Sequence, residues 1–438
     1  MRHNGRMKVE DAATPGAPAG AQLAGEASAD RPPAQSAGAG RRRPFGFGPA
    51  ANTLLAYTLV KGLQLALHLL IFPLYAYSLG YDQAAIGRLN ATGALTVFLV
   101  SVPLGVLADR VGRARLFAIC ALLTPPALTG LALARSYPAL IAWIVVMNIV
   151  GTVYWSALSP LLVGAVPEEQ RVRAFSVNTF FIFGVGALGS VIGGSVAAGA
   201  ARALGVAAAA TEPLRAALLV NAGIMLLGAL PVWRIRHLAA AGDGPAGRER
   251  LRLADLRLFG RLLLPDALQA FGAGAIIGFL PLFFTLRFGL PPGRLGLLFT
   301  LTGVLGGAAS LGSPALARLV GNIRAIVGLM AAVAGCMVAT VAAPVLAGAV
   351  AGETARSALR GMIDPIYTPY AMTRVAPHRR GTLGGLYNVT YATGFSLGPL
   401  LSGWLQVRYG FGPAFTVGAA AYLLAGASMW LFFGRATE

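Results

Sequence analysis

Four charged residues recur within the largely apolar stretch 346–371, at spacings of three, four and four: Glu353, Arg356, Arg360 and Asp364. At about 100° per residue, a helix would carry all four on one stripe roughly 80° wide. Charges inside a membrane are costly unless they pair or face water, so they mark candidate ion or substrate paths. Either these residues bind substrate and exchange protons, with Arg360 and Asp364 ranked first because they lie nearest the middle, or they form a structural ladder of salt bridges.

A second polar stripe runs through residues 51–78. Lys61, Gln64 and His68 fall within about 60° of one another on a helix. Lys61 is one of only two lysines in the chain. It either lines a polar path or extends toward the cytoplasmic surface. His68 is either an interhelical hydrogen-bond donor or a proton carrier.

Polar residues also occur in three other apolar stretches. Asp266 and Gln269 lie one helical turn apart within 262–286, where Asp266 is either the partner of Lys61 or a charge near a helix N-terminus. Stretches 138–163 and 382–406 add amides and aromatic rings, which suit a small-molecule pocket and are explained equally well by helix packing. These side chains are Asn148, Thr152, Trp155, Ser159, Tyr387, Asn388 and Tyr391.

The composition is that of a membrane protein. Of 438 residues, 56% are hydrophobic and 12% charged, whereas a soluble domain has about a quarter charged residues. The net charge of +19 does not indicate a nucleic-acid partner, because the basic residues lie between long apolar runs. The two cysteines, Cys120 and Cys336, lie in apolar runs away from metal-ligating residues, so no disulfide, metal site or cofactor is expected.

Twelve apolar stretches follow the N-terminal region, each near the roughly 20 residues that a membrane helix needs. Residues 1–48, rich in Ala, Gly and Pro, are expected to form a disordered cytoplasmic tail. A polar central loop at 234–261 should separate a six-helix bundle at 49–233 from another at 262–438. The stretches are 51–78, 85–107, 116–134, 138–163, 174–200, 215–233, 262–286, 295–317, 324–344, 346–371, 382–406 and 412–433.

The two halves of the chain repeat at an offset of 210 residues, at which Pro167, Asn178, Gly184 and Gly193 match Pro377, Asn388, Gly394 and Gly403. The fold class expected is therefore an all-α membrane protein, with twelve transmembrane helices in two pseudo-symmetric six-helix bundles. Arginines concentrate in alternate connections, including 110–115 and 234–261. By the positive-inside rule these connections and both termini should be cytoplasmic.

The connection between the second and third stretches runs from Gly105 to Arg115 as GVLADRVGRAR. It resembles the G-x-L-a-D-R-x-G-R-x-R signature of the major facilitator superfamily in both sequence and position. In that family this loop latches the halves on the cytoplasmic side, and the first, fourth, seventh and tenth helices line the central cavity. The resemblance implies that Asp109 and Arg113 control gating, with Glu168 or Glu169 as a partner. The gating residues so implied are Gly105, Asp109, Arg110, Gly112 and Arg113.

Together these features predict a transporter, not an enzyme. It would move a small molecule across the cell membrane by alternating access, as a proton-coupled secondary active transporter. The basic side chains favour an anionic substrate, and multidrug efflux within the same fold is the alternative. A receptor or an intramembrane enzyme is a different class, for which the sequence shows neither a sensor domain nor a protease site. The expected partners are substrate, protons and membrane lipid, and the protein is expected to be a monomer.

Overall fold

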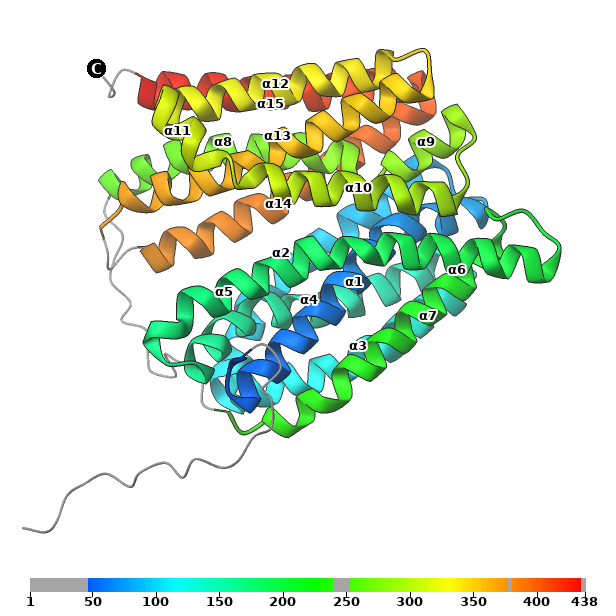
Figure 1. The fold of residues 1–438 in the computed structure, drawn as a ribbon, viewed down its shortest axis with the longest axis horizontal. Coiled ribbons are helices and arrows are strands. Elements are labelled where there is room, and N and C mark those ends of the chain that lie inside the picture. Colours follow the sequence, from blue (N-terminus) through cyan, green and yellow to red (C-terminus); the bar gives the residue numbers. More distant parts are fainter. Residues whose placement is uncertain (1–45, 239–252, 377–379, 435–438) are drawn as a thin grey trace, which may run out of the picture. The chain divides into compact units, whose positions relative to one another are not determined.

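The computed structural model describes residues 46–238, 253–376 and 380–434, and these residues form helices and no strand (Figure 1). The all-α fold class is confirmed. We call the helices before residue 239 the first half and those after residue 252 the second half. The first half contains α1 (Pro49–Ser78), α2 (Gln83–Val111), α3 (Arg113–Leu133), α4 (Tyr137–Ala165), η2 (Glu168–Gln170), α5 (Arg171–Thr179), η3 (Phe180–Gly184), η4 (Val185–Ala187), α6 (Leu188–Leu204), α7 (Thr211–Ala229) and η5 (Leu230–Ile235).

The second half is built in the same way from long helices. It contains α8 (Leu253–Ile277), α9 (Leu280–Phe288), α10 (Pro292–Ser310), α11 (Ser313–Val320), α12 (Asn322–Ala342), α13 (Leu346–Thr373), α14 (Arg380–Tyr409) and α15 (Phe411–Phe433). Each of the twelve predicted stretches falls on one of these helices or on two consecutive ones, except 174–200, which falls on α5, η3, η4 and α6.

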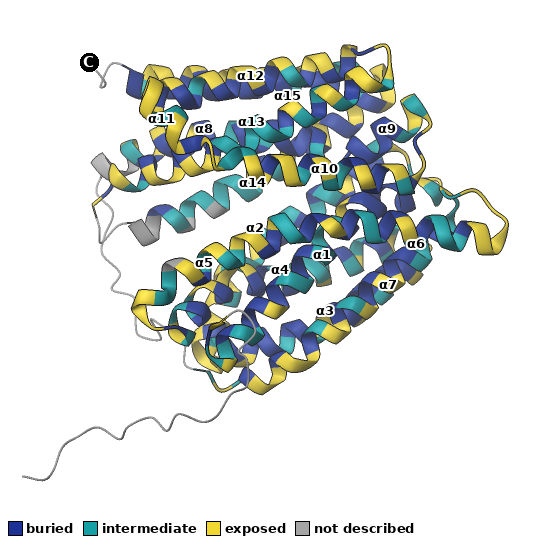
Figure 2. Ribbon diagram, viewed as in Figure 1, coloured by how far each residue is buried: buried dark blue, intermediate teal, exposed yellow. Residues whose placement is uncertain are grey.

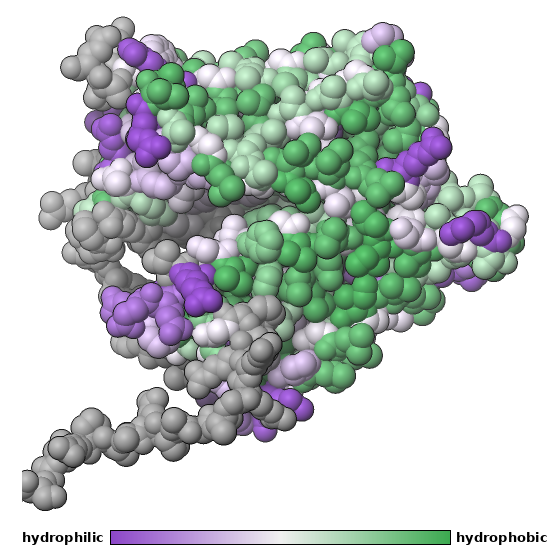
Figure 3. All heavy atoms as spheres, in the orientation of Figure 1, coloured by the Kyte–Doolittle hydropathy of each residue, from purple (hydrophilic) through white to green (hydrophobic). Residues whose placement is uncertain are grey.

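Most of the described helices can cross a membrane. Nine are long and apolar enough, and a tenth span exists if α10 and α11, which meet at a 48° bend, are one. Two long helices are not among these candidate spans: α14, and α13, which carries the four charged residues. The space-filling view shows hydrophobic side chains over the middle of both halves and polar ones toward the two ends (Figure 3). This is the surface that a lipid bilayer requires.

The central loop is shorter than the sequence predicts. Helix α8 begins at Leu253 rather than at residue 262, and η5 extends to Ile235. The side chains of Phe259 and Leu262 are 2% and 1% exposed, so packing against the second half explains why the helix starts early. Residues 239–252 of the predicted loop, and nearly all of the predicted tail, lie outside the described residues.

The fifth span is a broken helix. A π-helical turn (η3) and a 3-10 turn (η4) separate α5 from α6. Here the break packs against α1 through two glycines, because a Cβ on Gly186 would lie 2.8 Å from the backbone of Gly62. π-Helical turns inside longer helices are frequent at functional sites.

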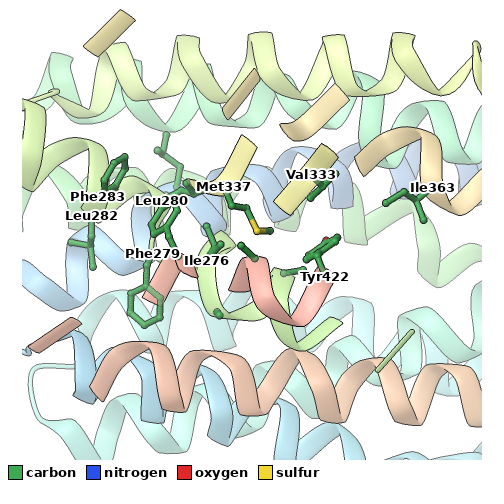
Figure 4. Packing of buried hydrophobic residues seen from close by; sticks show 14 of the residues in the cluster. Ile276, Phe279, Leu280, Leu282, Phe283, Val333, Met337, Ile363 and Tyr422 are labelled. Carbon is green, nitrogen blue, oxygen red and sulfur yellow. The ribbon is translucent and has the colours of Figure 1, made fainter. Parts of the chain in front are cut away.

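The buried apolar side chains form two clusters, seen as dark ribbon in Figure 2. One includes nearly the whole second-half core and residues of the first half near the α1–α2 connection at Gly80. Part of it, with Phe283, Met337 and Tyr422, is drawn in Figure 4. The other belongs only to the first half and lies near the α2–α3 connection at Gly112. We call these ends of the helices the Gly80 end and the Gly112 end.

Two helix pairs make most of the contacts between the halves: α2 with α14, and α6 with α10. Both contacts depend on glycine. A Cβ on Gly87 would meet the backbone of Pro399, and a Cβ on Gly296 would meet the backbone of Ser190. Small residues let membrane helices approach closely, so the halves are joined tightly along these two lines.

Candidate functional site

The four charges of α13 form two ion pairs within that helix. Arg356 donates two hydrogen bonds to the Glu353 carboxylate, Nε to Oε2 at 2.7 Å and Nη2 to Oε1 at 2.6 Å. Both residues are buried: Glu353 is 2% exposed and Arg356 is 5% exposed. One turn further, Arg360 pairs with Asp364 at 2.9 Å, and the Asp364 side chain is 51% exposed. The sequence prediction that these residues share one stripe agrees with this geometry, and the pairs have the arrangement of a ladder.

The polar stripe of α1 has a different character. The Lys61 ammonium donates to Gln64 Oε1 at 2.7 Å and lies 5.7 Å from the centre of the Tyr154 ring on α4. Lys61 is 8% exposed, and in the described part of the chain no ion pair joins it to an acid, Asp266 included. The His68 ring stacks on Phe72 with 5.0 Å between centroids.

Asp266 lies in the second half beside α13 and α14 instead of beside Lys61. It is 1% exposed, and neither carboxylate oxygen has a hydrogen-bond partner among the described residues. It is within electrostatic range of Tyr387, Asp364 and Arg360. The amide oxygen of Gln269, one turn along α8, is also buried without a partner in the described structure. Asp266 is thus a buried acid that forms no salt bridge with a described residue, although Arg360 is close enough to act on its charge.

Of the predicted residues on α14, Tyr387 lies 6.3 Å from Tyr367 between ring centres. Tyr391 stacks on Phe395 and is within electrostatic range of Arg360. The structure therefore brings Asp266, Arg360, Asp364 and both predicted tyrosines into one region of the second half. The side chain of Asn388 lies outside the described part of the structure.

The uncharged stripe of α4 bonds mostly to its own helix. Asn148 donates to the Ile144 carbonyl at 2.8 Å, and Thr152 donates to the Asn148 carbonyl at 2.7 Å. Trp155 is 54% exposed, and Ser159 is exposed as well. These residues do not line the cavity described next. Their contribution to a small-molecule pocket stays a prediction.

A cavity of about 290 Å³ lies between the two halves. Its walls come from α1, the η3–η4 break with α6, the α8–α9 segment, α10 and α13. Of the predicted site residues, Glu353 and Arg356 line it. Three of the four helices expected around a central cavity are present, and α4 is not among them.

Sequence reasoning missed several residues of this region. The hydroxyls of Ser190, Thr302 and Ser357 line the cavity, but isolated hydroxyls in apolar helices carry no distinctive spacing. Tyr422 on α15 is fully buried and within electrostatic range of Arg356 and Arg360. A tyrosine hydroxyl in the middle of an apolar stretch was the available signal for it.

The halves separate toward the Gly112 end. At the Gly80 end, residues of both halves belong to one apolar cluster, whereas the cluster at the Gly112 end contains residues of the first half only. Figure 3 shows a hollow between the halves near α5 and α11. The cavity thus belongs to a structure whose halves meet at one end only.

The motif at the Gly112 end has simple geometry. Gly112 alone joins α2 to α3, with φ of 93°. Asp109 pairs with Arg113 at 3.1 Å across this junction. A Cβ on Gly105 would meet no atom within 4 Å, so no other helix approaches this glycine closely in this arrangement. Glu168 lies 4.0 Å from Arg171.

The family model of the Major Facilitator Superfamily matches residues 54–399. The chain belongs to this superfamily. It is therefore a transporter-family protein rather than an enzyme, and the resemblance seen in the Gly105–Arg115 motif is confirmed. No curated protein matches the sequence.

Solved structures of the superfamily show the same fold. A bacterial homologue of the human lysosomal transporter Spinster, inward-facing and unoccupied, has a TM-score of 0.72 at 16% identity and covers 87% of this chain and 96% of its own. The nucleoside transporter NupG has a TM-score of 0.69 at 14% identity and covers 88% of this chain and 99% of its own. A bacterial homologue of the iron transporter ferroportin, also inward-facing, has a TM-score of 0.68 at 17% identity and covers 87% of this chain and 98% of its own.

Proposed function

We propose that the protein is a secondary active transporter that moves a small molecule across the cell membrane by alternating access. The observation that carries this proposal is the asymmetric joining of the halves. They share one apolar core at the Gly80 end and separate at the Gly112 end, with a cavity between them. Alternating access requires such a state and its opposite, related by rocking of two halves around a central site.

We place the Gly112 end in the cytoplasm, together with both termini and the central loop. The arginine-rich connections, including Arg110, Arg113 and Arg115, lie at this end, as the positive-inside rule requires. The state described is then inward-facing, with twelve helices forming a six-helix bundle in each half. A cysteine introduced at Gly244 should resist a membrane-impermeant maleimide added outside intact cells, and ready labelling there would reverse the topology.

The Asp109–Arg113 pair is proposed to control closure of the Gly112 end. In the state described, Gly105 faces open space and Asp109 pairs with Arg113 across the junction between α2 and α3. When the cytoplasmic ends approach, a residue without a Cβ at this position allows close backbone contact. The Asp109–Arg113 pair stabilises the closed state if these side chains form contacts there that are absent from the open state.

Proton coupling is proposed to use Asp266. Both Glu353 and Asp364 form salt bridges with guanidinium groups, whereas no described residue forms a salt bridge with Asp266. A carboxylate without an ionic partner can gain and lose a proton without breaking an existing pair. Asp364, half exposed beside Arg360, is the second candidate.

Reconstitution tests the proposal directly. Purified protein in proteoliposomes would be given radiolabelled anionic, cationic and uncharged compounds under an imposed pH gradient. We expect at least one compound to accumulate above protein-free liposomes, and the accumulation to vanish with a protonophore. In parallel, Val102→Cys should be labelled by maleimide less when the compound is bound. No accumulation and no change in labelling would contradict transport.

A further inference from the structure

The cavity between the halves has a wall whose chemistry limits what it can hold. Most of its lining is aliphatic or aromatic, with Leu65 and Leu69 from α1, Ile182 and Phe183 from the helix break, and Phe299 from α10. Its volume of about 290 Å³ lies at the small end of the range for small-molecule sites. The space suits a compact molecule with an apolar body.

The charged residues of this wall cancel each other. Glu353 and Arg356 are the charged side chains that line the cavity, and both carboxylate oxygens are bound by the guanidinium. Drawing either partner toward a ligand would leave the other charge buried and unpaired, which is strongly unfavourable. The arginine that suggested an anionic substrate from sequence is therefore already occupied by an acid.

The positive charge on α1 does not change this balance. Lys61 is not part of the cavity wall. Its ammonium is bound to Gln64 and lies over the Tyr154 ring, on the side of α1 that faces α4. A ligand ion in the cavity would thus find no opposite net charge in the wall, and burying it would cost far more than burying a neutral group.

The hydroxyls of the wall already donate their protons to backbone carbonyls. Ser357 donates to Thr302 at 3.0 Å, Thr302 to Phe299 at 3.1 Å, and Ser190 to Ala66 at 3.4 Å. One donor remains in a lining residue: Nη1 of Arg356 is buried and has no hydrogen-bond partner in the described part of the chain. A ligand with one acceptor oxygen that reached this nitrogen would satisfy it.

We propose that the substrate is a compact, uncharged and mainly apolar molecule with a hydrogen-bond acceptor such as a ketone, ether or alcohol oxygen. This inference rests on the proposed transport function and specifies its substrate class. The apolar wall binds the body of the molecule, and Arg356 binds the oxygen while Glu353 keeps the wall neutral.

The test compares probes that share one carbon skeleton. Equilibrium dialysis of the full-length protein in lipid nanodiscs would measure binding of 2-adamantanone, adamantane, adamantane-1-carboxylate and 1-adamantylammonium, each against empty nanodiscs. The ketone should bind at least about tenfold more tightly than either ion, because burying an unpaired charge exceeds the 1.4 kcal/mol that a factor of ten represents. The hydrocarbon should bind more weakly than the ketone.

Variants that fill the cavity show where the probe binds. Ala66→Phe and Leu69→Trp should each weaken ketone binding about tenfold or more, whereas Leu431→Phe, on an exposed face of α15, should not. The double variant Glu353→Leu/Arg356→Leu should keep binding of the hydrocarbon and lose the preference for the ketone.

Each other outcome overturns the inference. Equal or tighter binding of the carboxylate or the ammonium, blocked by the same variants, would make the substrate an ion. Binding that the filling variants leave unchanged would be partition into lipid. No specific binding of any probe would remove the cavity as a site for this class. Ketone binding without uptake into proteoliposomes would instead contradict the transport function and leave the binding inference standing.

Discussion

The connections at Gly112 and Gly321 show what the two halves share and where they differ. Each is a single glycine that ends one helix and begins the next, with φ of 93° in the first half and 84° in the second. The first carries the Asp109–Arg113 pair, whereas the second has no acid nearby in the sequence. Backbone geometry is repeated where only glycine fits, and side-chain chemistry is not.

The helix interiors differ in the same way. At the 210-residue offset, Arg360 and Asp364 of α13 correspond to Val150 and Tyr154 of α4, both buried in the first-half core. The first half instead holds one buried cation, Lys61, without an acidic partner in the described structure. A common helical scaffold therefore supports an ion-paired interior in one half and a mainly apolar interior in the other.

The largest effect is expected from splitting the buried pair of the second half. Arg356→Leu leaves the Glu353 carboxylate buried without its partner, which typically costs about 3–5 kcal/mol. Glu353→Leu/Arg356→Leu removes both charges and should be markedly more stable than the single variant. Lys61→Leu, in the first half, removes a buried charge that has no acid to orphan, so its unfolding temperature should change little or rise.

Thermal unfolding of the purified variants in one detergent measures all three. An unfolding temperature as low for the double variant as for the single one would show that the pair contributes more than mutual neutralisation. A loss for Lys61→Leu as large as for Arg356→Leu would remove the contrast between the two interiors.

The next effect tests the repeated backbone. At both junctions φ lies in a region that side chains rarely adopt, so Gly112→Ala and Gly321→Ala should each cost about 1–3 kcal/mol. Gly199→Ala is the matched control, because Gly199 lies within α6 with open space where its Cβ would be, and alanine favours a helix. Thermal unfolding is the measurement, and destabilisation at one junction alone would break the structural repeat.

The helices were predictable from the sequence because long apolar runs end at polar or glycine-containing connections. All twelve stretches fall on observed helices. The early start of α8 was not predictable in this way, since Leu253–Arg261 mixes arginines with leucines and becomes helical through packing of Phe259. The break between α5 and α6 was also missed, because its glycines act through contact with α1.

The candidate site was only partly predictable. Helical periodicity placed the α13 charges on one stripe, but it could not show that Arg356 donates two hydrogen bonds to Glu353. It also could not choose a partner for Asp266, since that depends on which helices touch in space. The cavity wall is mostly apolar, and an apolar lining has the same sequence signature as ordinary packing.

A smaller, functional effect separates the acids of the second half. Asp266→Asn should lower accumulation driven by a pH gradient at least about tenfold, equivalent to 1.4 kcal/mol, while counterflow exchange of the same substrate continues. Asp364→Asn should have the weaker effect, because this side chain is half exposed and paired with Arg360. Uptake into proteoliposomes with and without a gradient gives both values, and the reverse order would assign the proton to Asp364.

The smallest effect is expected at the Gly112 connection. The Asp109–Arg113 pair is solvent-exposed, and exposed pairs contribute about 0.2–1 kcal/mol. If the pair helps to close the cytoplasmic end, Asp109→Asn should raise the fraction of molecules open at that end about two-fold, since 0.4 kcal/mol changes an equilibrium constant by roughly that factor. Maleimide labelling of Val102→Cys, which lies 74% exposed in the open state, reports that fraction. Arg318→Gln is the control in the second half, where Arg318 pairs with no acid among the described residues. Equal labelling of the Asp109 variant and the parent protein would remove the difference in gating chemistry between the two connections.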